Sequence, residues 1–441
     1  MIGIYMFIAA LVLLLLGYPV AFSFGVIAMI FGFIAVFIEI MANGGVFVEV
    51  LDEFFSMFSM MPYRIYSIMT NKVLMAVPLF IFMGIVLEKS GLALRLLESM
   101  GTLFGKIRGG LAISTVLVGS LLAASTGVVG ASVVAMGVIS LPVMLKYGYN
   151  KELSTGTICA AGTLGQIIPP SIILIILGDV FGLPVGDLFK AAIYPSLALV
   201  VSYVIYILVI TNIKKDLAPI IENIAGKASI TDALIAIFPP LLLIVMVLGS
   251  IFAGIATPTE SASVGCVGAV IMAAVYKKFS FKMLESAARD TVKITAMVFA
   301  ILIGATAFSM VFVYTGADTI VENFMTSLPG EKWGFLILSM LVILLLGFFI
   351  DFFEISYIVV PILIPISVSI GIDPIWFAIL IAMNLQTSFL TPPFGFSLFY
   401  LKGVAPSGIK TTMIYKGVMP FILIQITILI TLLLFPKIFG F

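Results

Sequence analysis

GTLGQIIPPS, residues 162–171, interrupts a stretch that is otherwise apolar enough to cross a membrane. It combines two glycines, which weaken a helix, with two consecutive prolines, which end one, and with the polar side chains Thr163 and Gln166. In lipid, a broken helix leaves backbone polar groups without partners, which is costly unless they face a cavity, an ion or other protein atoms. The interruption therefore predicts a site that uses the freed backbone.

The composition predicts a polytopic α-helical membrane protein. Of the 441 residues, 62% are hydrophobic and 10% are charged, and the formal net charge is +1. This balance excludes a nucleic-acid-binding surface. The chain has no histidine, and its two cysteines, Cys159 and Cys266, lie far apart in apolar segments. Histidine relays, Ser-His or Cys-His nucleophiles and cysteine metal sites are therefore excluded, and neither an enzyme nor a resident cofactor is expected.

Two apolar runs are too long for one crossing. Residues 111–145 and 333–369 exceed the roughly 20 residues of a single span. Each has small or polar residues near its middle, so each is predicted to be a re-entrant hairpin with both ends on one side of the membrane. Basic residues flank the first hairpin on both sides, whereas mainly acidic residues precede the second. The first hairpin is therefore expected to open to the cytoplasm and the second to the outside.

The opening motif has a partner in QTSFLTPPFG, residues 386–395, because Pro169 and Pro170 match Pro392 and Pro393 at an offset of 223 residues. Upstream, Pro142, Gly148 and Asn150 match Pro365, Gly371 and Asp373 at the same offset. Such coincidences favour an internal repeat, and the charge pattern favours an inverted one. The predicted parts are a first repeat, 1–213, with a broken helix at 153–178; a cytoplasmic connecting loop, 214–232; and a second repeat, 233–441, with a broken helix at 374–401.

This architecture predicts binding sites at the bilayer midplane, as in secondary transporters. In the first half, the hairpin turn contains Ser125, Thr126, Gly127 and Ser132, and the break in the helix runs from Gly165 to Pro170. In the second half, the corresponding hairpin region contains Gly347, Asp351 and Glu354, and the break contains Ser388, Thr391 and Phe394. Oxygen ligands of low charge suit a monovalent cation such as sodium better than zinc or copper. Each half is predicted to bind one sodium ion, with an anionic substrate between them. Candidate substrate-lining residues are Ser132, Gln166, Asp351, Glu354, Gln386 and Thr387.

Each of these features also has a purely structural interpretation. Small residues such as Ser132 often serve close helix packing, and a Pro-Pro pair can be a structural kink. Glu260, in GIATPTESASVG, could relay protons or could cap the start of a helix. Asp351 and Glu354 could titrate during transport or could hold the hairpin turn.

Five motifs together resemble the large membrane subunit of tripartite ATP-independent periplasmic (TRAP) transporters, over essentially the whole chain. These motifs are TGVVGASVVAMGVISLPVMLKYGY, GTICAAGTLGQIIPPSI, GIATPTESASVG, LGFFIDFFEI and NLQTSFLTPPFGFSLFYLKGVAP. The forms TGVVGAS and DFFEI resemble the branch often labelled mannitol/chloroaromatic compound transport, which includes systems for 2-oxo acids and lactate.

This resemblance implies an elevator-type, sodium-coupled importer in the cytoplasmic membrane. It implies two partners, a small four-helix membrane subunit and a periplasmic substrate-binding protein. It also implies two ligand sets. The first sodium site would use Ser125, Thr126, Gly127, Gly165, Ile168 and Pro170, and the second would use Gly347, Ser388, Thr391 and Phe394.

Three other functions fit parts of the sequence. A proton-coupled exporter of organic anions, independent of a binding protein, would rely on Glu260, Asp351 or Glu354. An ion channel would need a continuous polar pore, which the apolar hairpins disfavour. A membrane scaffold without transport activity would tolerate changes in both Pro-Pro motifs.

Overall fold

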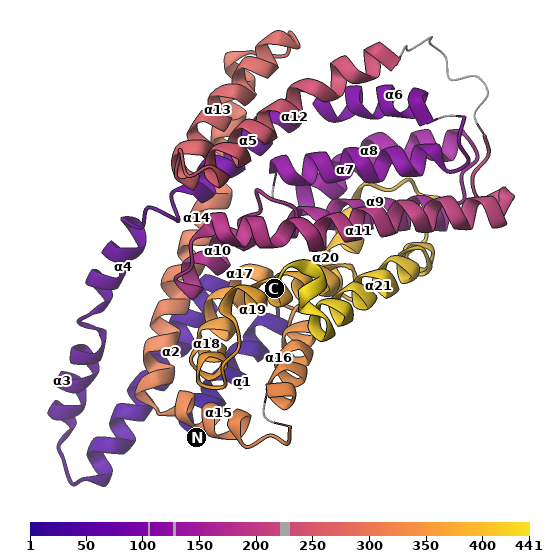
Figure 1. Ribbon diagram of the computed structural model, residues 1–441. Helices are drawn as coiled ribbons and strands as arrows, with labels where there is room; N and C mark the ends of the chain where they lie inside the picture. Colours follow the sequence, from indigo (N-terminus) through magenta and orange to yellow (C-terminus); the bar gives the residue numbers. More distant parts are fainter. Residues whose placement is uncertain (105, 127–128, 221–229, 331) are drawn as a thin grey trace. The chain divides into compact units, whose positions relative to one another are not determined.

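The computed structural model describes residues 1–104, 106–126, 129–220, 230–330 and 332–441, and all regular elements within them are helical (Figure 1). Seven of these helices are long and apolar enough to cross a membrane. The number is eight if α5 (Ala76–Lys89) and α6 (Leu92–Phe104), which meet at a bend of 59°, form one span. The expectation of an all-helical polytopic membrane protein is confirmed.

The contacts divide the chain into two compact units. The first unit contains residues 1–74 and 293–374. Its helices are α1 (Ile2–Leu15), α2 (Val20–Ala42), α3 (Phe47–Phe58), α4 (Met61–Met69), α15 (Ala317–Thr326), α16 (Lys332–Leu346), α17 (Phe352–Glu354) and α18 (Val360–Ser369), with a π-helical turn at Ile355–Val359.

The second unit contains residues 75–292 and 375–441. Besides α5 and α6, it holds α7 (Gly110–Thr126), α8 (Val129–Lys146), α9 (Lys151–Thr163), α10 (Ile172–Phe181), α11 (Val185–Ile213), α12 (Ile230–Phe252), α13 (Pro258–Val275), α20 (Phe396–Val404) and α21 (Thr411–Leu434), together with nearly all of α19 (Pro374–Leu390). Helix α14 (Phe281–Tyr314) begins in this unit and continues into the first. These units differ from the repeats 1–213 and 233–441, which are defined by sequence similarity and stay a prediction.

The predicted hairpin segments are helical pairs. Residues 111–145 form α7 and α8, which contact each other, and residues 127–128 at their turn lie outside the described residues. Residues 333–369 form α16 followed by α17, the π-helical turn and α18, and α16 contacts that turn.

Side-chain caps fix the starts of two helices in the second unit. The side chain of Asn150 accepts hydrogen bonds from the backbone N–H groups of Glu152 and Leu153 at the start of α9, at 2.8 and 3.0 Å. At the start of α13, the Glu260 carboxylate accepts the Thr257 N–H at 2.8 Å, and the Thr257 hydroxyl accepts the Glu260 N–H at 3.3 Å. This reciprocal pair is a capping box. It confirms the structural interpretation of Glu260.

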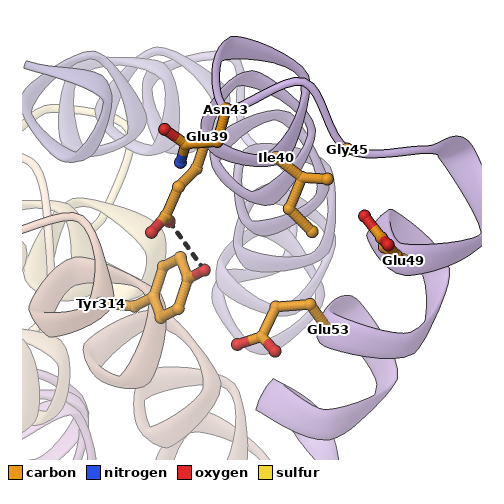
Figure 2. A pocket seen from close by; sticks show the side chains of 7 residues that line it. All are labelled: Glu39, Ile40, Asn43, Gly45, Glu49, Glu53 and Tyr314. Carbon is orange, nitrogen blue, oxygen red and sulfur yellow. Dashed lines mark hydrogen bonds between the residues drawn. The ribbon is translucent and has the colours of Figure 1, made fainter.

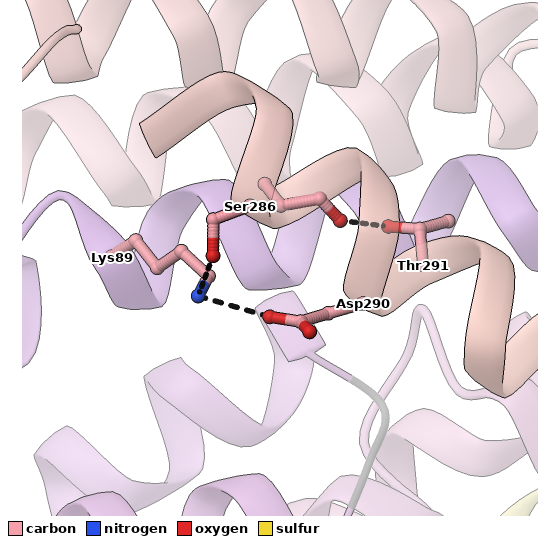
Figure 3. A network of polar contacts seen from close by, with 5 residues as sticks. Lys89, Ser286, Asp290 and Thr291 are labelled. Atoms are coloured by element: carbon pink, nitrogen blue, oxygen red, sulfur yellow. Dashed lines mark hydrogen bonds and ion pairs between the residues drawn. The ribbon is translucent and has the colours of Figure 1, made fainter. Parts of the chain in front are cut away.

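An ion pair holds the end of α5 against α14 (Figure 3). Lys89 Nζ lies 3.0 Å from Asp290 Oδ2 and donates a hydrogen bond to Ser286 Oγ at 3.0 Å. Directly after it the chain turns at Gly91, whose φ of 71° suits glycine, and α6 begins. The pair therefore fixes the place where α5 and α6 meet.

Replacing Lys89 by methionine is expected to lower the free energy of unfolding by about 1 kcal/mol or less, because the two side chains are 30% and 40% exposed and water screens them. Thermal unfolding of the purified chain would measure this change. Lys190→Met is the matched control, since Lys190 lies 3.9 Å from Asp187 with both side chains about half exposed. An equal loss in both variants would contradict a specific role for Lys89.

Candidate functional site

Two broken helices occupy the segments predicted from the Pro-Pro motifs. Helix α9 ends at Thr163 and continues as a 3₁₀ turn, Leu164–Gln166. The chain then runs without regular structure to Ser171, and α10 begins at Ile172. Helix α19 ends at Leu390, and α20 begins at Phe396. The peptide bonds Pro169–Pro170 and Pro392–Pro393 are both cis.

Each pair of prolines frees two successive carbonyl groups. A helical carbonyl accepts the N–H of the residue four positions later, and proline has none. The carbonyls of Gly165 and Gln166 precede Pro169 and Pro170 by four residues, and Ser388 and Phe389 precede Pro392 and Pro393 in the same way. The second carbonyl of each pair accepts a serine hydroxyl from beyond the break. Ser171 Oγ donates to Gln166 O, and Ser397 Oγ donates to Phe389 O at 2.8 Å.

These two serine bonds were not predicted, although Gln166 and Phe389 are related by the repeat offset of 223 residues. The serines themselves are not at matched positions, since Ser171 directly precedes α10 whereas Ser397 lies inside α20. The two halves therefore share a carbonyl that accepts a serine hydroxyl, but the serine occupies a different position in each half. Each is a hydroxyl residue within four positions after a Pro-Pro pair, but that placement alone does not identify the carbonyl to which it bonds.

Ser397→Ala is expected to destabilise the protein by about 1–3 kcal/mol, because the Phe389 carbonyl would lose its donor in a buried place. Thermal unfolding would measure the loss. Ser367→Ala is the matched control, since Ser367 is equally buried but its hydroxyl donates to Ile364 O inside α18 at 2.8 Å. A loss no greater than that of the control would show that the bond across the break contributes little.

The first carbonyls of the two pairs, those of Gly165 and Ser388, differ in their hydrogen bonds. Ser388 O accepts the Thr391 N–H at 3.1 Å, which tightens the last turn of α19. In the first break, the N–H groups of Ile167 and Ile168 both donate to Leu164 O, at 3.1 and 2.9 Å. Gly165 is buried and has Pro169 in the place of its helical donor, so its carbonyl makes no α-helical hydrogen bond and is a candidate ligand.

Hydroxyl groups gather at the end of α19. Thr387 Oγ1, Ser388 Oγ and Thr391 Oγ1 donate to the carbonyls of Met383, Leu385 and Thr387, at 2.9, 2.7 and 2.7 Å. A hydroxyl that donates its proton keeps two lone pairs. These three oxygens can therefore accept a cation while their protons stay bonded to the helix. Tyr415 of α21 adds a further bond that was not predicted, from its hydroxyl to Pro393 O at 2.8 Å.

The second unit brings the first predicted hairpin onto the first break. Helix α7 contacts the 3₁₀ turn Leu164–Gln166, and α8 contacts both α9 and that turn. At Gly162 a side-chain carbon would overlap Val133, so α8 passes very close to α9 there, next to the buried Ser132. Ser125 and Thr126 form the end of α7, and their side chains, like all of Gly127, lie outside the described residues.

The residues predicted for the second site are divided between the units. Gly347 belongs to the first unit, as do the substrate-lining candidates Asp351 and Glu354, and Ser388, Thr391 and Phe394 belong to the second. Asp351 starts α17, where its Oδ1 accepts the Phe352 N–H at 2.6 Å. Glu354 is 2% exposed, and its Oε2 has no hydrogen-bond partner among the described residues. Their assembly into one site stays a prediction.

The candidate substrate-lining residues of the second unit are all buried. Gln166 and Gln386 are fully buried, and neither amide group has a hydrogen-bond partner among the described residues. Thr387 and Ser132 are 1% and 2% exposed. A cavity of about 510 Å³ reaches Ile168 and Pro169, but its lining is apolar apart from Ser120 and Ser196, so it does not suit an anion.

An acidic pocket of about 330 Å³ lies in the first unit between α2, α3 and the end of α14. Figure 2 shows Glu39 and Tyr314 facing each other across it, and the Tyr314 hydroxyl donates to Glu39 Oε2 at 2.9 Å. Glu49 Oε2 accepts the Val46 N–H at 3.1 Å, as part of the cap of α3. Two of its three carboxylates are therefore engaged in local bonds. Among the described residues, no group of three or more His, Cys, Asp or Glu side chains is placed to hold a metal ion.

Comparison with known proteins identifies the chain. Residues 7–438 match the family model of the tripartite ATP-independent periplasmic transporter, DctM component. The chain is 31% identical to the C4-dicarboxylate TRAP transporter large permease protein DctM of Pseudomonas aeruginosa, over 85% of this chain and 87% of that protein. It is 30% identical to the protein of the same name from Vibrio cholerae, over 96% and 94% of the two chains.

More distant matches are consistent with these. The sialic acid TRAP transporter permease protein SiaT of Haemophilus influenzae is 27% identical, over 94% of this chain and 67% of that one. Among solved structures, the Alcanivorax borkumensis YdaH transporter has a similar fold, with a TM-score of 0.65 at 14% identity, over 88% and 90% of the two chains. The chain is therefore a multi-pass permease of the bacterial inner membrane rather than an enzyme, and it belongs to the DctM family, the large component of TRAP transporters.

Proposed function

We propose that this permease imports a small organic anion together with sodium ions. Relatives are named for C4-dicarboxylates, isethionate and sialic acid, all of which are organic anions. The single observation that carries the sodium part is the pair of broken helices, in which Pro-Pro motifs at one offset free the carbonyls of Gly165 and Ser388 from α-helical donors. Freed carbonyls and hydroxyls are suitable ligands for a hard monovalent cation.

The first sodium ion lies between the turn of α7 and α8 and the first break, with Ser125, Thr126, Gly127, Gly165, Ile168 and Pro170 as its ligand set. This site is supported by the contact of α7 and α8 with the 3₁₀ turn Leu164–Gln166. The second ion uses Gly347, Ser388, Thr391 and Phe394. It is supported by the hydroxyls at the end of α19 and by the match of Ser388 and Thr391 to Gly165 and Ile168 at the repeat offset.

Transport follows an elevator mechanism in two inverted repeats. Sodium binding orders both hairpin turns and completes the substrate site, and the loaded domain then moves across the bilayer as a unit. Differential affinity for the two states supplies the coupling between ion and substrate. A periplasmic binding protein delivers the substrate, and a small four-helix subunit completes the permease. The motifs TGVVGAS and DFFEI support a branch associated with mannitol/chloroaromatic compound transport, and the proposed substrate is a 2-oxo or 2-hydroxy acid.

Uptake of labelled pyruvate, lactate or succinate into proteoliposomes tests this function. The liposomes would contain the chain and its small subunit, with the binding protein outside. Uptake is expected to need both an inward sodium gradient and the binding protein. Uptake that needs neither would overturn the proposal.

A proton-coupled exporter is the second candidate, and the observation that favours it is Glu354, a buried carboxyl whose Oε2 has no partner among the described residues. A proton carrier of this kind would give flux that depends on pH and not on sodium. Glu354→Gln would abolish that flux. In a sodium-coupled importer the same variant would leave the sodium requirement in place.

A further inference from the structure

Two buried amide groups near the broken helices lack partners. Gln166 belongs to the 3₁₀ turn of the first break, and Gln386 lies in α19 shortly before the second. Both side chains are 0% exposed, and Nε2 and Oε1 of each have no hydrogen-bond partner among the described residues. A side-chain amide has two donor hydrogens and an acceptor oxygen, and burying it without partners destabilises the fold. Next to breaks that free backbone carbonyls, such groups are placed to hold a ligand.

The two glutamines occupy related places in the repeat. At the offset of 223 residues, Gln166 matches Phe389 and Gln386 matches Thr163. The positions 163 and 166, and equally 386 and 389, are three residues apart, so each pair shares one face of its helix. Each break thus has one amide on the corresponding face. Both belong to the second unit, where α9 contacts α20 and Cys159 Sγ lies 3.7 Å from Ser397 O.

No buried cation accompanies these amides. Among the described residues, Glu354 is the only charged side chain in the buried class, and every described lysine and arginine is at least partly exposed. An anion bound in the interior must therefore receive its hydrogen bonds from neutral groups and its charge compensation from a bound ion. Each amide can donate hydrogen bonds to a carboxylate oxygen. Burying a second carboxylate would cost its hydration free energy, and no buried cationic side chain among the described residues would compensate for its charge.

We propose that the carboxamides of Gln166 and Gln386 bind the carboxylate of the transported anion, and that this permease selects monocarboxylates because its recognition groups are neutral. This inference rests on the proposed function, since it takes the ligand to be an organic anion that binds together with sodium. It goes further by assigning the recognition groups and the charge of the substrate.

The test uses the purified full-length chain and measures thermal unfolding with pyruvate, L-lactate, succinate and L-malate, in sodium chloride and in potassium chloride. In the unchanged chain, pyruvate or lactate is expected to raise the unfolding temperature in sodium, and the two dicarboxylates are expected to have less effect. In Gln166→Leu and Gln386→Leu, half-maximal stabilisation should need about tenfold more ligand or more, which is the loss expected for a hydrogen bond to a charged group.

A readout without ligand separates this role from a structural one. Leucine removes a buried amide that has no protein partner, so both variants should unfold at the same temperature as the unchanged chain or higher when no carboxylate is present. Gln166→Met and Gln386→Met repeat the test with a flexible side chain of similar length. Gln425→Leu is the matched control. The Gln425 amide is equally buried and also has no hydrogen-bond partner among the described residues, but α21 carries neither break, so its ligand response should be unchanged.

Three results would overturn the inference. They are an unchanged ligand response in the Gln166 and Gln386 variants, stabilisation by the dicarboxylates alone, and no stabilisation by any of the four acids. The proposed function fails by a different result, namely uptake into proteoliposomes that needs neither sodium nor the binding protein.

Discussion

Thr391→Val is expected to raise the sodium concentration for half-maximal uptake by at least about tenfold, the scale of effect seen when a metal site loses an oriented oxygen. Valine has nearly the shape of threonine, so the packing around the half-buried side chain is kept while Oγ1 is lost. The proton of Oγ1 is bonded to Thr387 O at 2.7 Å, which leaves both lone pairs for a cation. Its match in the first break is Ile168, which offers only a carbonyl. The second site should therefore depend on this hydroxyl.

Thr391→Val also removes the hydrogen bond from Thr391 Oγ1 to the carbonyl of Thr387, four residues earlier. A control variant must lose the same kind of hydrogen bond. Thr427 provides it, because its Oγ1 donates to Leu423 O at 2.7 Å in the same pattern within α21, on an exposed side chain. Thr427→Val should leave the sodium dependence unchanged. Proteoliposome uptake over a range of sodium concentrations measures both variants. An unchanged sodium dependence in Thr391→Val would remove Thr391 from the ligand set.

The sequence predicted the broken helices well, because the signals for a break are local. The prolines at 169–170 and 392–393 lack N–H donors whatever surrounds them, and the break predicted for Gly165–Pro170 agrees closely with the end of α9 at Thr163 and the 3₁₀ turn that follows. The capping box of Glu260 is local as well. The sequence left its role open only because a carboxylate in an apolar segment fits two interpretations.

Features that depend on distant partners were missed. Helix α14 begins at Phe281, where the sequence is rich in charged residues rather than apolar ones. That polar start is held by Lys89, which lies about 200 residues away in the chain, and by the pair of Arg289 with Glu285 at 2.9 Å. The bend between α5 and α6 was also missed, although Ser90 and Gly91 are a recognisable helix end.

Partners across a break are equally hard to read from sequence. Ser171, directly after Pro170, donates to the carbonyl of Gln166. Ser397, two residues after Gly395, donates to the carbonyl of Phe389. Neither serine lies in a distinctive sequence pattern. Sequence patterns identify which groups a break frees. They do not identify which of those groups the protein satisfies itself and which it leaves for a ligand, and that difference defines the candidate site.

Gly417→Val is expected to have the largest effect on stability, at least about 3 kcal/mol, because it inserts a branched side chain where two helix backbones touch. A side-chain carbon at Gly417 of α21 would overlap the carbonyl oxygen of Glu152 in α9, and one at Gly156 would overlap the carbonyl oxygen of Gly417. The obstructing atoms are backbone atoms of two packed helices, which cannot move aside as a flexible side chain can. The two helices would have to separate.

That separation would spread to the first break, since α9 leads directly into the 3₁₀ turn Leu164–Gln166 and contacts α7 and α8 as well as α21. Loss of a monodisperse peak in size-exclusion chromatography, or a much lower unfolding temperature, would show the effect. Gly249→Val is the control, because Gly249 lies on an exposed face of α12 with no other atom within 4 Å of the added carbon. Equal stability of the two variants would mean that α9 and α21 do not pack backbone to backbone, and α21 would then not support the first break.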